Sequence, residues 1–444
     1  MIRGIRLGAS AAAAARRSVS TLNAATKYTT LSNGVTVASE HNPHAPLAAV
    51  GVFFGAGSRA ETPYNNGIAA LTASVLGHGL DNGVLLSSQS SKETNAVIAQ
   101  LSNADIAAAA QKVAGVVSNA AAAVEKADFA EAKRAQIARA AALEAQPLQM
   151  LLEHLNASAF QGYSLGLPTL GTADSIADLE KSDALRLLEK HLVGSNTVVA
   201  ASGNFEHEAL VEALESALQV PGGIKPAVAP ASFLGSEVRM RDDTMPKAYV
   251  SIAAQGEGLN SPAYHVAQVG AAIFGSFDHA AAISKFTSPK LASIVQEYHI
   301  VDKYQHFSTS YSDTGLWGFN AEISNLAQID DFVHFTLKEW NRLSVSITDA
   351  EVARGKAQAK TALLASLNSP VAIASEVASK VLLQGYKASI SQDLAAIDAI
   401  TTKDVKAWAS AALWDKDIVI AGTGSIEGLL DYNRSRNDMA MLRF

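Results

Sequence analysis

The feature of this sequence that most restricts its fold is an internal repeat. The pattern Pro-x-Ala-x-Val at residues 46–50 recurs at residues 246–250. Further identities share one constant offset, and they pair Ile176, Leu179, Asp183, Leu192, Val198, Ala200, Gly203 and Glu206 with Ile397, Ile400, Asp404, Leu413, Val419, Ala421, Gly424 and Glu427. A shared spacing of this kind indicates that one structural unit occurs twice. We therefore predict two homologous halves of about 200 residues each.

Apolar periodicity predicts both strands and helices in these halves. Strands are expected at residues 28–31, 35–40, 48–54, 84–91, 94–102 and 196–202, the first two around an Asn33-Gly34 turn. Helices are expected at residues 68–76, 103–125, 129–145, 148–160, 206–218 and 265–274. Runs of strands and long helices favour an α+β fold, with helices packed on an antiparallel-rich sheet in each half.

Three boundaries divide the chain. The Pro- and Gly-rich residues 221–230 indicate a linker. We expect a first domain at residues 28–220, a linker at residues 221–233 and a second domain at residues 234–444. Residues 1–39 contain no Asp or Glu but carry Arg3, Arg6, Arg16 and Arg17. Basic, Ser-bearing and acid-free segments are typical of mitochondrial presequences, so residues 1–27 are predicted to be one; a flexible basic tail is the alternative.

Composition excludes several classes of function. The formal net charge of −7 and the pI near 5.9 argue against nucleic acid as the main partner. The absence of cysteine excludes disulfides, thiolate metal sites, iron–sulfur ligation and cysteine nucleophiles. No run reaches the ~20 apolar residues that a membrane span needs. We therefore expect any contact with a membrane to be made through partner proteins.

The segment around the helix at residues 68–76 carries a family resemblance. Asn65, Asn66 and Gly67 precede that helix. This segment resembles the zinc helix of the inverzincin (pitrilysin-like) metallopeptidases, above all the mitochondrial processing peptidases, where Asn-Asn-Gly is followed by His-x-x-Glu-His. In register with that motif stand Ala70, Ala73 and Ser74. Zinc hydrolysis needs imidazole ligands and a general-base carboxylate, which methyl groups and a hydroxyl cannot supply. The comparison predicts no catalytic residue, no metal and no cofactor.

Further segments in the second half limit the resemblance to particular members of the family. Residues 237–246, 311–319 and 424–444 are similar to the β-type peptidases and to their non-catalytic relatives, the core subunits of mitochondrial ubiquinol–cytochrome c reductase. The family's further glutamate ligand would fall near Arg139 and Ala140, and Glu144 lies about one helical turn beyond. The α-type peptidase subunit carries a long glycine-rich loop, whereas residues 274–278 here are short and poor in glycine.

The resemblance implies a structural role. It implies two domains that enclose a cavity, and a non-catalytic subunit on the matrix side of the mitochondrial inner membrane, held peripherally by partners. The implied partners are core protein 2, cytochrome b and cytochrome c1, and the redox chemistry belongs to the cofactor-bearing subunits. Two alternatives remain: a zinc-dependent processing peptidase subunit that cleaves presequences, and a non-catalytic subunit that presents peptides to an active partner. The missing zinc motif and the short loop, respectively, argue against them.

Other candidate groups have structural interpretations. His41 and His44 flank a proline in a loop expected to be solvated, and His78 is expected to cap a helix or lie on the surface. Glu153 and His154 are helix neighbours, so they point about 100° apart and do not form an obvious acid–base pair.

Two further features each have two interpretations. Tyr311 and Trp317 either line the cavity implied by the family or pack in the sheet. The apolar ending of the chain contains Met441, Leu442 and Phe444. It either docks on a partner or folds back onto the second half.

The leader generates the first testable prediction. We expect the mature protein to begin between Ser18 and Lys27, because the acid-free, Arg-rich leader is followed by the strand pattern that begins at Tyr28. N-terminal sequencing of the mitochondrial form measures the start directly. Recovery of intact Met1 inside the organelle would contradict the prediction.

Overall fold

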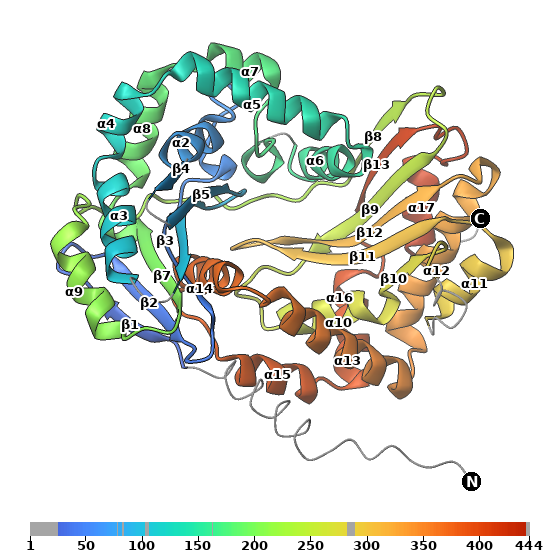
Figure 1. Cartoon of the computed structure of the whole chain (residues 1–444). Coiled ribbons are helices and arrows are strands. Elements are labelled where there is room, and N and C mark those ends of the chain that lie inside the picture. The colour runs from blue at the N-terminus through green and yellow to red at the C-terminus, as the bar shows by residue number, and fades with distance from the viewer. Residues whose placement is uncertain are drawn as a thin grey trace, which may run out of the picture.

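The computed structural model describes residues 25–77, 79–81, 84–102, 106–161, 163–281 and 289–440. The predicted leader up to residue 24, His78 and the tail residues 441–444 lie outside these ranges. Two mixed sheets, one in each half of the chain, form the centre of the molecule, and helices surround them (Figure 1). The α+β prediction with two similar halves is therefore confirmed.

The first sheet has seven strands in the order β1-β2-β7-β3-β6-β5-β4. They are β1 (Lys27–Thr30), β2 (Thr36–His41), β3 (Leu47–Phe54), β4 (Gly79–Asp81), β5 (Val84–Ser90), β6 (Asn95–Ser102) and β7 (Thr197–Gly203). All neighbours are antiparallel except β2 and β7, which are parallel. The predicted strands of the first half all form, and their ends differ from the prediction by at most one residue.

The second sheet repeats this topology. Its order is β10-β11-β12-β9-β13-β8, which matches β4-β5-β6-β3-β7-β2 of the first sheet strand for strand. These strands are β8 (Ser236–Arg241), β9 (Ala248–Gly256), β10 (Ser276–Asp278), β11 (Lys303–Ser310), β12 (Gly315–Ile323) and β13 (Ile418–Gly424). The parallel pair recurs as β13 with β8. Strands β7 and β13 start at Thr197 and Ile418, so they are separated by the same offset as Val198 and Val419 in the sequence repeat. Among the strands that the structure describes, β1 alone has no counterpart in the second sheet.

The helices surround both sheets. Those of the first half are α2 (Ile68–Leu76), α3 (Ile106–Ser118), α4 (Ala120–Lys126), α5 (Phe129–Glu144), α6 (Pro147–Ala159), α7 (Ala173–Asp178), α8 (Lys181–His191) and α9 (His207–Ala217). Those of the second half are α10 (Tyr264–Phe274), α11 (Lys290–Tyr298), α12 (Ile329–Val345), α13 (Asp349–Ser366), α14 (Pro370–Gln384), α15 (Ile390–Ala399), α16 (Thr402–Ala412) and α17 (Tyr432–Asp438).

One helix prediction was wrong. The single helix expected over residues 103–125 is two helices, α3 and α4, that meet at Asn119. The Asn119 side chain donates to the Gly115 carbonyl, 2.8 Å away. Asparagine side chains compete for backbone hydrogen bonds and so favour helix ends over helix interiors, which the alanine-rich pattern on both sides concealed.

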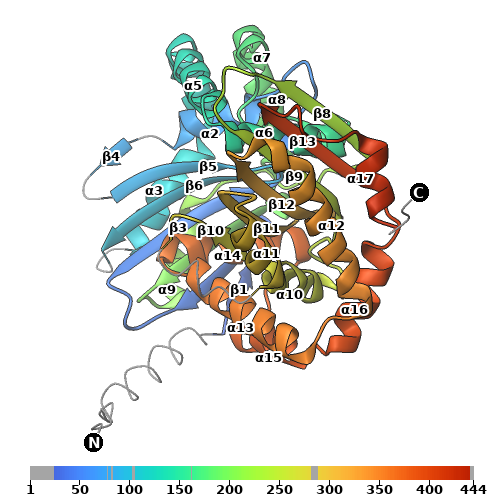
Figure 2. The same cartoon turned by 90° about the vertical axis from the view of Figure 1, so that its right-hand side faces the viewer.

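The central strands of each sheet are buried on both faces, and alternate residues of a strand serve the two sides. On the outer face of the first sheet, Val50 and Val52 of β3 join the core formed with α2, α3 and α9. On the inner face, Ala49 and Phe53 pack against a helix of the second half, α14, through Val377 and its neighbours. The outer face of the second sheet is covered by α10, α12 and α16 (Figure 2).

The inner face of the second sheet is covered by a helix of the first half. Helix α6 supplies Leu151 and Leu155, which pack against Val419 and Ala421 of β13. The two halves thus exchange helices: α6 lies on the second sheet and α14 lies on the first (Figure 1). Neither sheet is a complete layered unit without the other half.

The segment after the predicted linker and the C-terminal segment are both tied to the fold. The Leu234 amide donates to the Ala159 carbonyl at the end of α6, over 2.9 Å. At the other end, Met439 is fully buried in the core of the second half, and the Asp438 carbonyl accepts from Asn341 of α12 over 2.6 Å. Up to residue 440 the chain therefore folds back onto its own second half. The docking hypothesis for Met441, Leu442 and Phe444 falls outside the described residues.

Among the described residues, no single helix combines the length and the apolar character of a membrane span. Helices α13 and α14 meet those criteria only when taken together, and they are bent by 108° where they join.

The helix exchange predicts a large cost for shortening one buried side chain. Leu155→Ala on α6 removes a fully buried group from the contact with the second sheet. We expect the free energy of unfolding to fall by about 2–5 kcal/mol, because the cavity it leaves is walled by both halves. Urea denaturation of the purified chain measures this. The control is Leu85→Ala, at a side chain that is 49% exposed; equal losses for the two variants would contradict the packing.

Candidate functional site

The helix aligned with the family's zinc helix is α2, and it lies inside the first half. Ala70, Ala73 and Ser74 are all buried, with 5%, 2% and 9% of their surface exposed. The Ser74 hydroxyl donates to the Leu71 carbonyl of the same helix over 2.8 Å. The three positions therefore offer two methyl groups and a hydroxyl that is already committed to the backbone.

The N-terminus of α2 is held by a buried carboxylate. Glu61 accepts hydrogen bonds from the amides of Gly67 and Ala69, at 2.9 and 2.6 Å, and from the Asn66 side chain at 2.7 Å. A negative charge is favourable at this end of a helix. Gly67 has a φ of +96°, a conformation that glycine adopts without strain. Burial nevertheless raises the pKa of Glu61 to about 7, against the opposing effect of these three donors. Asn66 and Gly67 therefore help to form the N-terminus of α2.

Helix α5, which carries the positions aligned with the family's further ligand, contacts α2. Ala140 is buried there, whereas Arg139 and Glu144 are not. The buried polar residue of α5 is Gln136, whose side-chain amide donates to the carbonyls of Gly67 and Leu170 over 2.9 and 2.8 Å. Within the described ranges no group of three or more His, Asp or Glu side chains could hold a metal ion. This donor set does not fit zinc.

The remaining polar candidates from the sequence do not converge. The His41 ring donates from Nδ1 to the Phe205 carbonyl over 2.8 Å, and His44 is exposed. Glu153 is paired with Lys92 at 2.6 Å, while burial lowers the pKa of its neighbour His154. These groups therefore do not form a common site.

A large cavity lies between the halves. Its volume is about 1110 Å³, and its walls come from the β5–β6 hairpin (residues 90–94), strand β11 and helices α10, α13 and α14. Tyr311 lines it and donates to the Asn156 side chain of α6 over 2.6 Å. Trp317 instead is fully buried in the core of the second half, where its indole donates to the Ala267 carbonyl. Of the two aromatic candidates, only Tyr311 faces the cavity.

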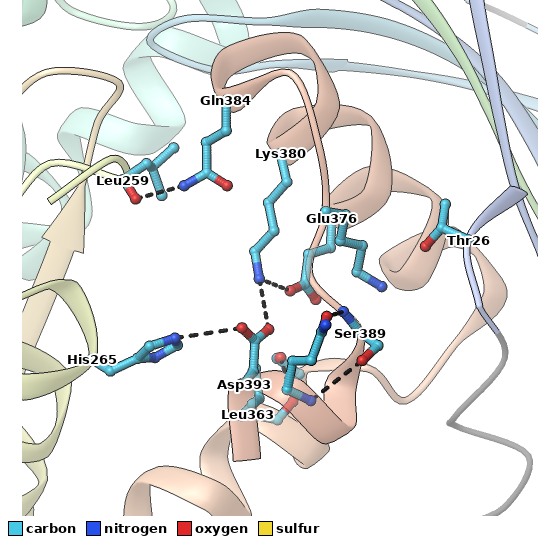
Figure 3. Close-up of polar contacts among 12 residues, drawn as sticks. Thr26, Leu259, His265, Leu363, Glu376, Lys380, Gln384, Ser389 and Asp393 are labelled. Carbon is cyan, nitrogen blue, oxygen red and sulfur yellow. Dashed lines mark hydrogen bonds and ion pairs between the residues drawn. The ribbon is translucent and has the colours of Figure 1, made fainter. Parts of the chain in front are cut away.

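One wall of the cavity carries a charged cluster that sequence reasoning missed. Lys380 of α14 lies 2.9 Å from Glu376 and 3.2 Å from Asp393 of α15, and His265 of α10 lies 3.4 Å from Asp393 (Figure 3). Burial disfavours the charge on Lys380, but the two carboxylates outweigh it and raise the pKa of the ammonium. These contacts tie the exchanged helix α14 to its own half.

The two halves and the predicted linker also meet at one arginine. Arg59 is 8% exposed, and its guanidinium contacts Glu93 at 2.8 Å and both carboxylate oxygens of Asp313 at 2.8 and 2.7 Å. It also donates to the Ala229 carbonyl of the linker over 2.9 Å. Ser312 of the second half donates to Glu93 in turn. No local pattern pointed to this junction, because its members are separated by up to 254 residues.

Two family models match the chain. The model described as Insulinase (Peptidase family M16) matches residues 36–173, and the Peptidase M16 inactive domain matches residues 178–359. Relatives at 37% to 57% identity extend over nearly the whole chain. The chain belongs to peptidase family M16.

Individual relatives are of two kinds. A mitochondrial cytochrome b-c1 complex reductase subunit of Candida albicans is 57% identical over 418 residues, covering 94% of this chain and 95% of the relative. The cytochrome b-c1 complex subunit 1 of Saccharomyces cerevisiae is 42% identical, covering 97% of each chain. A probable mitochondrial-processing peptidase subunit beta of Schizosaccharomyces pombe is 37% identical, covering 97% of this chain and 98% of the relative.

A solved structure extends this comparison to three dimensions. A chain in the structure titled Complex III2 from Candida albicans, Inz-5 bound, superposes with a TM-score of 0.92. It is 57% identical, and the match covers 94% of this chain and 100% of that one.

The α2 geometry predicts that the chain does not bind zinc at Ala70, Ala73 and Ser74. Methyl groups are not ligands and a serine hydroxyl is a poor one, so we expect zinc far below one equivalent. Metal analysis of the chain purified without chelator tests this. A zinc content of about one equivalent that disappears in Ser74→Ala would contradict it.

The Glu61 carboxyl predicts a pH dependence of stability. Its pKa is about 7 in the folded chain, above the ordinary value of 4.5, so folding favours the protonated form. Its contribution is therefore complete below pH 4.5 and is lost as the pH rises to about 7, a change of up to about 3 kcal/mol.

Urea denaturation at several pH values measures this effect. The free energy of unfolding of the natural chain relative to Glu61→Gln should fall between pH 4.5 and 7 and change little above. Glu125→Gln, at an exposed glutamate, is the control. A pH-independent difference between the natural chain and Glu61→Gln would contradict the assignment.

Proposed function

We propose that this chain is a structural, non-catalytic core subunit of the mitochondrial ubiquinol–cytochrome c reductase (cytochrome b-c1 complex, complex III), in the role of core protein 1. The observation that carries the proposal is the match to a chain of a complex III structure, with a TM-score of 0.92 at 57% identity. The match covers the whole of that chain, so both halves, with their exchanged helices, belong to the comparison.

The lost zinc chemistry supports a non-catalytic role. The positions of the family motif, Ala70, Ala73 and Ser74, supply neither imidazole nor carboxylate. Metallopeptidases need both, to hold the ion and to deprotonate the attacking water. The cavity between the halves persists, but the Lys380 cluster and Tyr311 on its walls are held in ion pairs and hydrogen bonds of the fold. Redox centres belong to other subunits in this proposal, and a chain without cysteine offers no thiolate for an iron–sulfur cluster.

We place the chain on the matrix side of the inner membrane, peripheral to it, in contact with core protein 2 and supporting cytochrome b and cytochrome c1. Attachment through partners agrees with the finding that no single helix among the described residues is fit to span a membrane. The rival function is a processing peptidase subunit, favoured by the 37% identity to a probable β subunit. The α2 residues disfavour it.

A mild-detergent extract of mitochondria tests the proposal. We expect the chain to comigrate with cytochrome b and cytochrome c1, and its depletion to reduce the amount of assembled complex. Incubation of the purified chain with a presequence peptide should give no cleavage. Purification as a lone monomer would contradict the core-subunit role, and zinc-dependent cleavage would support the peptidase.

A further inference from the structure

The first described residues of the chain contact the second half. Thr26 Oγ1 donates to the Glu40 carboxylate of β2 over 2.8 Å, and Glu40 forms an ion pair with Lys387 of the second half. The Tyr28 hydroxyl accepts from the Lys387 amide at 3.0 Å and lies 3.3 Å from the Lys387 carbonyl, to which it donates. Two side chains of this short segment thus engage the ion pair and the backbone at one joint.

Lys387 lies where the chain passes from one half of the structure to the other. It lies between α14, which packs on the first sheet, and α15, which belongs to the second half. The side chains of Lys387 and Glu40 are 1% and 8% exposed. A buried ion pair is favourable only when its remaining hydrogen-bonding capacity is also satisfied. Thr26 supplies one such bond to Glu40, so the segment completes the pair.

Strand β1 positions this segment. Lys27 pairs with Ser39 and Tyr28 pairs with Ala38, which aligns Tyr28 beside the edge of β2. In the part of the chain that the structure describes, the second sheet has no strand in the equivalent position next to β8. The extra strand of the first sheet thus makes a contact with the second half, the one with Lys387, that has no counterpart in the second sheet.

We propose that leader removal takes place at or before the Ala25–Thr26 peptide bond, and that Thr26 and Tyr28 then form an N-terminal clasp that fastens the first half to the α14–α15 joint. Hydrolysis of the bond by water leaves a carboxylate on the leader and a new amine on the chain. A cut after Thr26 would remove the donor to Glu40. A cut after Tyr28 would also remove both bonds to Lys387.

Hydrogen exchange tests the clasp directly. Tyr28→Phe keeps the ring but removes the acceptor of the Lys387 amide, so exchange at Lys387 should accelerate by about tenfold. Thr26→Val, which leaves that acceptor in place, should accelerate it by a smaller factor. Thr30→Val on the same strand, at an exposed residue, is the control. The measurement uses the chain purified from mitochondria together with the proteins that accompany it.

Two outcomes would overturn the proposal. The first is an unchanged rate at Lys387 in Tyr28→Phe relative to Thr30→Val. The second is a mature N-terminus at Lys27 or later, found by N-terminal sequencing of the same sample. Sequencing that finds a start between Ser18 and Thr26 supports it, whereas intact Met1 would show that no leader is removed and would contradict it. If Tyr28→Phe does not fold, Thr26→Val takes its place, and an unchanged rate of hydrogen exchange at Lys387 in that variant would contradict the proposal. Neither arm depends on which partners copurify, so failure here is distinct from failure of the complex III role.

Discussion

The rest of the structure depends on the need of each sheet for cover on both faces. Strand β3 presents Val50 and Val52 to one side and Ala49 and Phe53 to the other. Helices packed on one face alone would therefore leave the apolar residues of the other face exposed. The molecule satisfies this need by exchange, since α14 covers the first sheet and α6 covers the second. Opening the halves would expose two apolar sheet faces at once, at roughly 25 cal/mol for each Å². The two halves are therefore folded as one body.

Polar contacts then fix how the halves sit on each other. Arg59 joins a hairpin of the first half, a hairpin of the second and the predicted linker, and a buried guanidinium with two carboxylates tolerates little displacement. Burial opposes the charge on Arg59, but its hydrogen bonds to Asp313 and Glu93 outweigh burial, so the pKa of the guanidinium is raised. The Lys387–Glu40 pair joins the halves in the same way, whereas the Lys380 cluster holds the exchanged helix α14 to its own half. Hydrophobic contacts hold the two halves together, and these polar groups fix the position of one half relative to the other.

Sequence reasoning predicted the repeat and most elements of the first half, but not the long-range contacts. The constant offset of the repeat matched β7 to β13, and the apolar run from Ile68 to Leu76 matched α2. Local rules failed at Asn119, where one polar side chain ends a helix inside an alanine-rich run. They could not find the exchanged helices either, because α6 and α14 bury one apolar side whichever sheet they cover. The roles of Arg59 and Lys387 could not be predicted either, because the residues that contact them lie far away in the sequence.

The candidate site shows why a peptidase scaffold can lose its zinc motif and keep its fold. Zinc ligands on α2 would be buried polar groups that need the ion to satisfy them. Ala70 and Ala73 carry no such requirement, and Ser74 meets its own within the helix. The buried carboxyl group of Glu61 caps α2 through backbone amides and takes no part in the motif. The packing of α2 therefore rests on apolar contacts and on the Glu61 cap. Two walls of the cavity are fixed by contacts within the fold, since α14 packs on the first sheet and is paired through Lys380 with α15.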